Sequence, residues 1–422
     1  GSLENNQAIM KKMASTNKKT IASALIGNVL EWYDFAIYGY FASAIGLAFF
    51  PKSDPTAQLL MAFSIFAVGY LMRPIGAIIF GHVGDKYGKK VALNLSVGAM
   101  AIPTFFVSIL PDYNAWGVWA AYSLVMLRMI QGLSVGGELT TSIIYLVSNS
   151  PKNRQALMGA LITCGAISGI LLGSFTSDLI NHLLPEEEIN AWGWRIPFFF
   201  GLIIGVVGLL MRRHLADDVP APTLKPPLLV VYQNHLPLLF NISGLVFLNA
   251  VGFYIVFVYL VTWFEVVEKF TPIKALDINT ISMFILIGVV LFSGYLADKI
   301  GKKFMLKITT TLLLLFVIPL FYLMDHHDIR LAFIGQLGLT ILLGSSLGPI
   351  NAFLVLSTPE AVRCSTIGIG YNLTNGIIGG LTPLAATWLF AKTGEPISPA
   401  YLIVAAAIVT IFALYKNKSN IS

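Results

Sequence analysis

The chain carries the sequence Gly81-His-Val-Gly-Asp-Lys-Tyr-Gly-Lys-Lys90, and the same pattern returns as Gly294-Tyr-Leu-Ala-Asp-Lys-Ile-Gly-Lys-Lys303. The second copy begins 213 residues after the first, which is about half of the 422-residue chain. Each copy follows one long apolar segment and precedes another. A motif repeated at this distance, between segments of the same kind, predicts two halves of similar build.

The segments that surround both copies are apolar enough to cross a membrane. The sequence is 56% hydrophobic and 11% charged, which is less than half of the charge of an average soluble protein. Uncharged runs of about 20 residues recur along it, as membrane-spanning helices require. Open sheets cannot span a bilayer, and the runs are longer than the roughly ten-residue strands of an outer-membrane barrel. We therefore predict an all-α integral membrane protein.

Apolar runs between charged or proline-rich breaks predict twelve membrane-spanning helices. Their expected starts lie near residues 20, 57, 89, 115, 154, 193, 234, 278, 303, 329, 362 and 397. The break between the sixth and seventh helices is rich in proline and reads as a linker. The predicted parts are a cytoplasmic N-terminal tail (1–19), a six-helix bundle (20–213), a cytoplasmic linker (214–233), a second six-helix bundle (234–416) and a cytoplasmic tail (417–422).

The distribution of basic residues predicts the orientation. Of the 27 Lys and Arg residues, 19, with Arg212 among them, fall in the tails and loops expected on the side of the termini. Six fall in the loops on the opposite side, so the positive-inside rule places both termini in the cytoplasm. The last two, Arg73 and Arg128, lie within predicted spans. The net charge of +6 thus follows from topology and does not indicate a nucleic-acid partner.

The first predicted helix holds two carboxylates, Glu31 and Asp34, about ten or more residues from either end of its apolar segment. Acids at this depth must face protein or a water-filled cavity. They are three residues apart and share a helix face, where two like charges favour protonation of one of them. We expect at least one to couple transport to protons, with Asp34 preferred because it lies deeper. The alternative is that both are structural and pair with basic residues.

The fourth predicted helix carries a polar stripe, because Arg128, Gln131 and Glu138 fall on one face. Arginine offers a forked donor that matches a carboxylate, so Arg128 could bind a substrate carboxylate. Equally, it could form a permanent ion pair with Asp34 or Glu138. For Glu138 itself, proton coupling and static pairing both stay open.

In the second helix Arg73 precedes Pro74, which removes a backbone donor and is expected to bend the helix. Arg73 either lines the cavity or packs between helices and pairs with Glu31.

The second half has almost no buried charge, so its part of a binding site should be neutral. Tyr371 and Asn375, four residues apart, are the best pair. The candidates are Asn249, Tyr254, Asn351, Tyr371, Asn372 and Asn375.

The repeated loops are candidates for gating. Asp85 and Asp298 can accept hydrogen bonds from a helix N-terminus. We expect Asp85 to reach the start of the eleventh helix and Asp298 the start of the fifth, which would hold the cytoplasmic side shut. The lysines beside them could instead serve topology alone. The gating candidates are Gly81, Asp85, Lys86, Gly88, Lys89, Arg154, Gly294, Asp298 and Arg363.

The doubled loop resembles the signature of the major facilitator superfamily. Five further blocks are similar to its metabolite:proton symporter family, which includes proline/betaine, alpha-ketoglutarate, citrate and shikimate permeases. They are Gly27-Asn-x-x-Glu-Trp-Tyr-Asp-Phe35, Phe49-Phe50-Pro51, Arg73-Pro74-Ile-Gly76, Arg128-x-x-Gln-Gly-x-x-x-Gly-Gly-Glu138 and Trp194-Arg-Ile-Pro-Phe198. The resemblance implies the major facilitator fold, with twelve transmembrane helices in two pseudo-symmetric six-helix halves. It also implies uptake of a small carboxylate-bearing metabolite driven by protons.

The expected function is therefore secondary active import, by proton symport and rocker-switch alternating access, of an organic acid, amino acid or betaine. An exporter of a polycarboxylate that works by proton antiport, and a non-transporting membrane sensor, are the alternatives. No phosphate loop, nucleophile–base pair or metal-ligand spacing occurs in the sequence. We expect no enzyme activity, no cofactor and no metal, and as partners a small-molecule substrate, protons and the lipid bilayer. The expected form is a monomer in the bacterial inner membrane.

Overall fold

The computed structural model describes residues 1–52, 55–215 and 227–417, and all the regular elements in these ranges are helices. Residues 216–226 and 418–422 lie outside the described part, so most of the predicted linker and of the predicted C-terminal tail cannot be compared. The chain divides into two units. The first comprises residues 1–150 and 165–224, and the second comprises residues 151–164 and 225–422.

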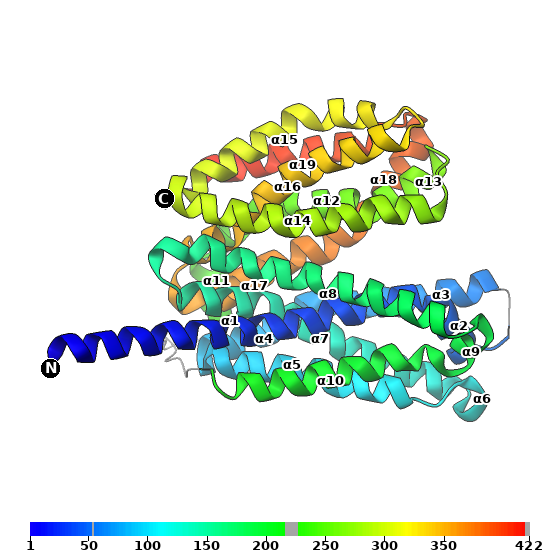
Figure 1. Cartoon of the computed structure of the whole chain (residues 1–422), viewed down its shortest axis with the longest axis horizontal. Coiled ribbons are helices and arrows are strands. Elements are labelled where there is room, and N and C mark those ends of the chain that lie inside the picture. The colour runs from blue at the N-terminus through cyan, green and yellow to red at the C-terminus, as the bar shows by residue number, and fades with distance from the viewer. Residues whose placement is uncertain (53–54, 216–226, 418–422) are drawn as a thin grey trace. The chain divides into compact units, whose positions relative to one another are not determined.

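The first unit is built from long helices that run side by side, and α1 and α5 contact each other and both pack against α7 and α10 (Figure 1). Its elements are α1 (Ser2–Tyr40), α2 (Ala42–Phe49), α3 (Pro55–Leu71), α4 (Arg73–Tyr87), α5 (Lys89–Ile109), α6 (Tyr113–Trp116), α7 (Val118–Ser148), most of α8 (Gln155–Leu183), α9 (Glu186–Glu188), η2 (Ile189–Gly193) and α10 (Arg195–Arg212).

The second unit packs α14, α15 and α16 together and α19 against α12 and α15 (Figure 1). It also takes η1 (Lys152–Arg154) and the first turns of α8. Its other elements are α11 (Pro227–Asn234), α12 (Leu236–Phe253), η3 (Tyr254–Tyr259), α13 (Leu260–Val266), α14 (Pro272–Ile300), α15 (Lys302–Met324), α16 (Ile329–Leu356), η4 (Glu360–Val362), α17 (Arg363–Leu373), η5 (Thr374–Gly379), α18 (Gly380–Thr393) and α19 (Ser398–Lys416).

Ten helical stretches of the described residues are long and apolar enough to cross a membrane. The two other predicted spans correspond to α1 followed by α2, and to the stretch 363–393, which the π-helical η5 interrupts. The helix α1 also runs through the predicted tail, because no glycine or proline interrupts residues 2–26. As expected from Pro74, the second span breaks: α3 ends at Leu71, and the proline lies in the first turn of α4.

The repeated motif ends one helix and begins the next in the same way in both copies. Gly88 has φ of 109° and Gly301 has φ of 107°, a region that residues with a side chain rarely adopt. Each glycine terminates one helix and precedes a helix that begins with lysine. The sequence repeat therefore corresponds to a repeat of backbone conformation.

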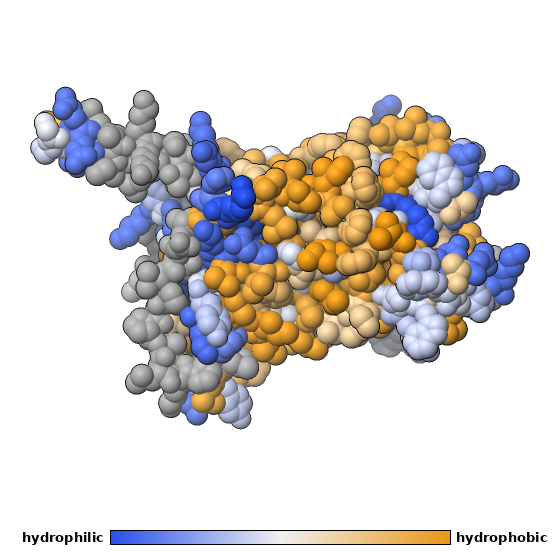
Figure 2. Space-filling view, turned by 90° about the horizontal axis from the view of Figure 1, so that it is seen from below, coloured by the Kyte–Doolittle hydropathy of each residue, from blue (hydrophilic) through white to orange (hydrophobic). Residues whose placement is uncertain are grey.

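The outward side chains of the spans are apolar. On α10, Phe199, Phe200 and Leu210 are about half exposed, whereas Gly201, Gly205 and Gly208 are buried on the opposite face. The face seen in Figure 2 carries a hydrophobic middle with hydrophilic residues toward its ends. This pattern is that of helices whose outer surface meets lipid.

Candidate functional site

Asp34 and Arg128 form a buried ion pair in the first unit. Nη1 of Arg128 lies 2.5 Å from Oδ2 of Asp34, and the two side chains are 1% and 0% exposed. Gln131 joins them: its Oε1 accepts from Arg128 at 2.9 Å, and its Nε2 donates to Asp34 Oδ1 at 3.3 Å and to Thr104 Oγ1 at 2.9 Å. Of the two roles left open for Arg128, the structure shows the pair with Asp34.

The ion pair borders an aromatic cluster, which we define as Trp32, Phe35, Tyr38, Phe66 and Tyr70. Neighbouring rings in it have centroids 5.5 to 6.2 Å apart. The guanidinium of Arg128 lies 4.3 Å from the Tyr38 ring centroid and 5.3 Å from that of Phe35, within the range of cation–π attraction. Arg128 Nε is buried and has no hydrogen-bond partner in the described part of the chain. One donor therefore remains available beside the rings.

Arg73 is also buried, at 1% exposure, and belongs to the same surroundings. It donates to the Tyr70 hydroxyl at 2.7 Å, and its guanidinium lies 4.9 Å from the Tyr70 ring centroid and 5.9 Å from that of Trp32. The predicted ion pair with Glu31 does not appear among the described ion pairs.

Glu138 pairs with Arg212. The sequence-based prediction that Arg212 lies in a loop is therefore wrong. Arg212 ends α10 and is fully buried. Its Nη1 donates to Glu138 Oε2 at 2.9 Å, and its Nη2 donates to Glu138 Oε1. It also donates to the carbonyls of Ser23 and Leu93, at 2.9 and 2.8 Å. Among the described ion pairs, Glu138 pairs with Arg212 and not with Arg128 or Arg73, and its part in proton coupling stays a prediction.

Glu31 forms no direct ion pair in the described residues, although Arg73 and Arg212 lie close enough to act on its charge. Its Oε1 accepts from Ser134 at 2.9 Å, and its buried Oε2 has no partner in the described residues. Ser134 also contacts the Ser96 carbonyl at 2.6 Å, and the Ser96 hydroxyl donates to Glu138. Ser134 and Ser96 thus connect Glu31 to the Glu138–Arg212 pair, through the main-chain carbonyl and then the hydroxyl of Ser96.

The charge count of the first half changes in consequence. Three acids, Glu31, Asp34 and Glu138, and two arginines were assigned to the predicted spans, and Arg212 adds a third buried arginine. Asp34 and Glu138 each have an arginine partner, whereas Glu31 forms no ion pair with another described residue.

Sequence reasoning missed Arg212 because Arg213 follows it, and two adjacent arginines mark the end of a span. The signal that could have found it is the spacing of Gly201, Gly205, Gly208 and Arg212, which places all four on one helix face. It also missed the hydroxyls that contact the acids, because serine and threonine are common in any span. These are Ser96, Thr104, Ser134 and Ser142.

The neutral candidates of the second unit are mostly engaged by their own surroundings. Asn249 accepts from Ser346 at 3.1 Å, and Asn351 donates to the Gly159 carbonyl and to Thr163, both at 2.9 Å. Asn372 and Asn375 donate to carbonyls one turn earlier, so Asn375 contacts the main chain of Tyr371. The ring of Tyr254 covers Gly379, where an added Cβ would lie 2.6 Å from it. Tyr254 and Asn375 lie on the π-helical segments η3 and η5, a form frequent at functional sites.

Asp298 contacts the start of α8, as predicted for the fifth helix. Its carboxylate accepts from the main-chain nitrogens of Ala156 and Leu157, at 2.8 and 3.0 Å, and Lys302 lies 3.5 Å from it. Gly294 makes the approach possible, because a Cβ there would lie 2.8 Å from that of Ala160. These residues all belong to the second unit.

The other gating candidates remain predictions. Gly81 and Asp85 are buried in α4, and Lys86 lies 5.3 Å from the ring centroid of Tyr87. Lys89 begins α5, and Arg154 is exposed at the end of η1. Arg363 donates to the Thr358 carbonyl at 2.9 Å, just before α17.

Comparison with known proteins places this geometry in context. A sequence model described as the Major Facilitator Superfamily matches residues 24–383. The proline/betaine transporter of Salmonella typhimurium is 32% identical over 409 residues, which cover 93% of this chain and 81% of that protein. The glycine betaine/proline/ectoine/pipecolic acid transporter OusA of Dickeya dadantii shows the same identity and coverage. These matches confirm the resemblance drawn from the sequence motifs.

Among solved structures, the proton:xylose symporter XylE from E. coli superposes with a TM-score of 0.77. Each chain is covered to 95%, at 16% sequence identity. At this identity the likeness concerns the fold, and it confirms the predicted all-α major facilitator architecture.

Proposed function

Because the chain belongs to the Major Facilitator Superfamily and is a multi-pass membrane transporter, we propose that it imports a small zwitterion, a betaine or an amino acid such as proline, together with protons. The observation that carries this proposal is the Asp34–Arg128 pair beside the aromatic cluster. The names of its relatives support the same substrate class.

A zwitterion matches this arrangement better than a dicarboxylate does. Its carboxylate can bind the forked guanidinium of Arg128, which already has one unpartnered donor. Its cationic end can lie against the faces of Tyr38, Phe35 and Tyr70 or beside Asp34, since aromatic faces attract quaternary ammonium groups. A dicarboxylate would bring a second negative charge close to Asp34, which like-charge repulsion opposes.

We propose Glu31 as the residue that carries the proton, in place of the earlier preference for Asp34. Burying a charged carboxylate without a directly paired counter-ion is costly, and Glu31 is 1% exposed with a serine hydroxyl as its described hydrogen-bond partner. Asp34 has Arg128, so its charge is compensated until substrate competes for the arginine. Uptake would then release Asp34 from the arginine and load Glu31 with a proton.

The proposal also covers the driving force of transport, the membrane in which the protein lies and its orientation there. The proton gradient drives accumulation, so we assign no bound cofactor. The excess of basic residues in one set of loops supports a bacterial inner membrane with both termini in the cytoplasm. Alternation of access by a rocker-switch movement, in a monomer, is the mechanism that we propose on this fold.

Uptake by proteoliposomes that contain the purified chain tests the proposal. With an alkaline lumen and an acidic outside, labelled glycine betaine or proline should accumulate above its outside concentration, and a protonophore should abolish this. Arg128→Ala should abolish uptake and saturable binding, whereas Arg330→Gln, at an exposed arginine, should change neither.

Three results would contradict the proposal. Uptake that only equilibrates, whatever the pH difference, would rule out proton symport. Accumulation of succinate in place of zwitterions would rule out the substrate class. Accumulation of substrate in inverted vesicles with an acidified lumen would indicate export by proton antiport.

A further inference from the structure

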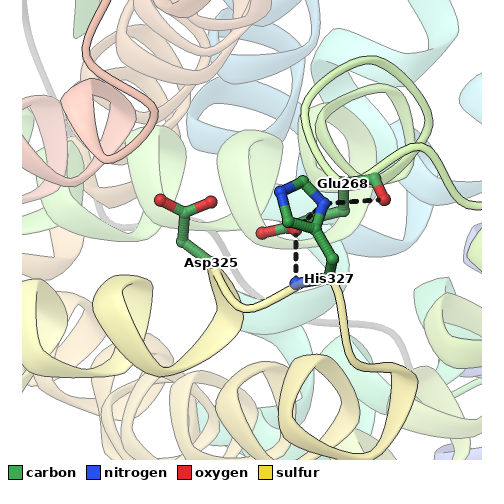
Figure 3. Close-up of side chains that lie close together, drawn as sticks. All are labelled: Glu268, Asp325 and His327. Carbon is green, nitrogen blue, oxygen red and sulfur yellow. Dashed lines mark hydrogen bonds and ion pairs between the residues drawn. The ribbon is translucent and has the colours of Figure 1, made fainter.

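Two loops of the second unit bring three potential metal ligands together. Glu268 lies in the loop between α13 and α14, and Asp325 and His327 lie in the loop between α15 and α16. One carboxylate oxygen of each acid and one ring nitrogen of the histidine lie within 4.8 Å of one another. In Figure 3 the carboxylate of Glu268 lies between the Asp325 side chain and the His327 ring.

The buried member of this group lacks a partner for one oxygen. Glu268 is 2% exposed. Its Oε2 accepts from the main-chain nitrogen of His327 at 2.9 Å and lies 3.1 Å from its ring Nδ1. Its Oε1 is buried and has no hydrogen-bond donor in the described ranges. An oxygen in this position, close to a second carboxylate, requires a proton or a cation beside it.

The electrostatics of the group agree with this requirement. Burial, and then the nearby carboxyl of Asp325, raise the pKa of Glu268 to about 7. Two acids therefore share a small volume in which their charges are poorly compensated. A divalent cation between them would neutralise both and would also give Oε1 a ligand bond.

We propose that Glu268, Asp325 and His327 form a binding site for a divalent transition-metal ion of the Zn²⁺ class. Carboxylate oxygens and imidazole nitrogens are both ligands of Zn²⁺, and open zinc sites have three protein ligands with water completing the coordination. The imidazole favours Zn²⁺ over Ca²⁺ or Mg²⁺, which prefer oxygen ligands throughout. The sequence predicted no metal site, because the ligands come from two loops far apart in the chain.

A metal ion could reach this site from solvent, and its binding would stabilise the two loops. The His327 side chain is 64% exposed, so an ion can enter from solvent on that side. His327 has φ of 52°, and Lys269, next to Glu268, has φ of 61°, conformations that cost energy for residues with a side chain. An ion held by both loops would stabilise them and tie the ends of α13, α15 and α16 together.

Metal binding to the full chain tests the proposal. The purified protein, with any affinity tag removed and metal stripped by EDTA, is titrated with Zn²⁺ in detergent by calorimetry and equilibrium dialysis. One Zn²⁺ should bind per chain and raise the unfolding temperature. Glu268→Gln and His327→Asn should each weaken binding tenfold or more, while the matched control His326→Asn, at the exposed neighbouring histidine, should leave it unchanged.

X-ray absorption of the zinc-loaded protein adds a readout that does not depend on stability. It should show one imidazole and oxygen ligands at about 2.0–2.1 Å, and the imidazole should be lost in His327→Asn. If the purified protein bound no stoichiometric Zn²⁺, the proposal would be overturned. A proton shared by Glu268 and Asp325 would then explain how the two acids lie together. Equal losses in His326→Asn and His327→Asn, or equally tight Ca²⁺, would overturn it too. None of these outcomes depends on transport, so the proposed function stands or falls separately.

Discussion

The replacement Arg212→Met tests whether the Glu138–Arg212 pair is structural. It removes both hydrogen bonds to Glu138 and the donors to the carbonyls of Ser23 and Leu93. Glu138 stays buried, with the hydroxyls of Ser96 and Ser142 as its remaining described donors. Removing one partner of a buried pair costs about 3–5 kcal/mol. At about 2–4 °C per kcal/mol for a unit of roughly 200 residues, the unfolding temperature should fall by roughly 10 °C.

The assay is thermal unfolding in detergent, followed by tryptophan fluorescence. Arg213→Met is the matched control, because the neighbouring arginine is exposed and its loss should shift the midpoint by less than about 1 °C. The double variant Glu138→Gln/Arg212→Met removes both charges, so it should be more stable than Arg212→Met alone. Glu138→Gln alone and the wild type complete a double-mutant cycle. The free energy of unfolding lost in the double variant, compared with the sum of the losses in the two single variants, measures the coupling of the pair.

Two outcomes would refute the structural reasoning. If Arg212→Met and Arg213→Met had the same small effect, the arginine would not be buried beside Glu138. If the single and double variants were equally destabilised, Glu138 would already be neutral in the native protein. The second result would return Glu138 to the list of proton carriers.

Three further predictions concern Glu31 and the glycines. Glu31→Gln should abolish accumulation driven by a proton gradient but keep counterflow exchange of labelled substrate, since Gln cannot titrate; loss of both would contradict the assignment. Gly27→Ala should lower the unfolding temperature, because its Cβ would collide with the Glu138 carboxylate, whereas Gly39→Ala has open space and should not. Gly301→Ala should cost about 1–2 kcal/mol at its φ of 107°, measured as a lower unfolding midpoint than that of Gly288→Ala, which should equal or exceed wild type.

The sequence determined the architecture well, because hydrophobic length and a repeated motif depend on local composition. The repeated loops show the same glycine conformation at Gly88 and Gly301, and Asp298 lies at the helix start to which it was assigned. The shared face of Glu31 and Asp34 also follows from helix periodicity alone.

Pairing between helices was less predictable, because it depends on rotation and depth that composition does not encode. Arg128 could have paired with either Asp34 or Glu138, and both choices respected the charge count. The structure assigns Asp34 to it and gives Glu138 to Arg212, a residue whose neighbour Arg213 made it look like part of a loop. A one-residue error at a helix end thus changed the charge balance of the whole site.

The division of polar groups between the units constrains where coupling can occur. In the first unit the two ion pairs join α1 to α7 and α7 to α10, and Glu31 of α1 contacts Ser134 of α7. In the second unit Asn372 and Asn375 bond to their own helix, and Asn249 bonds to a neutral serine. Neutral amides cannot exchange a proton at physiological pH. Among these groups, the proton coupling that we propose would therefore have to use the first unit, and the amides of the second would contribute only shape and hydrogen bonds to a substrate.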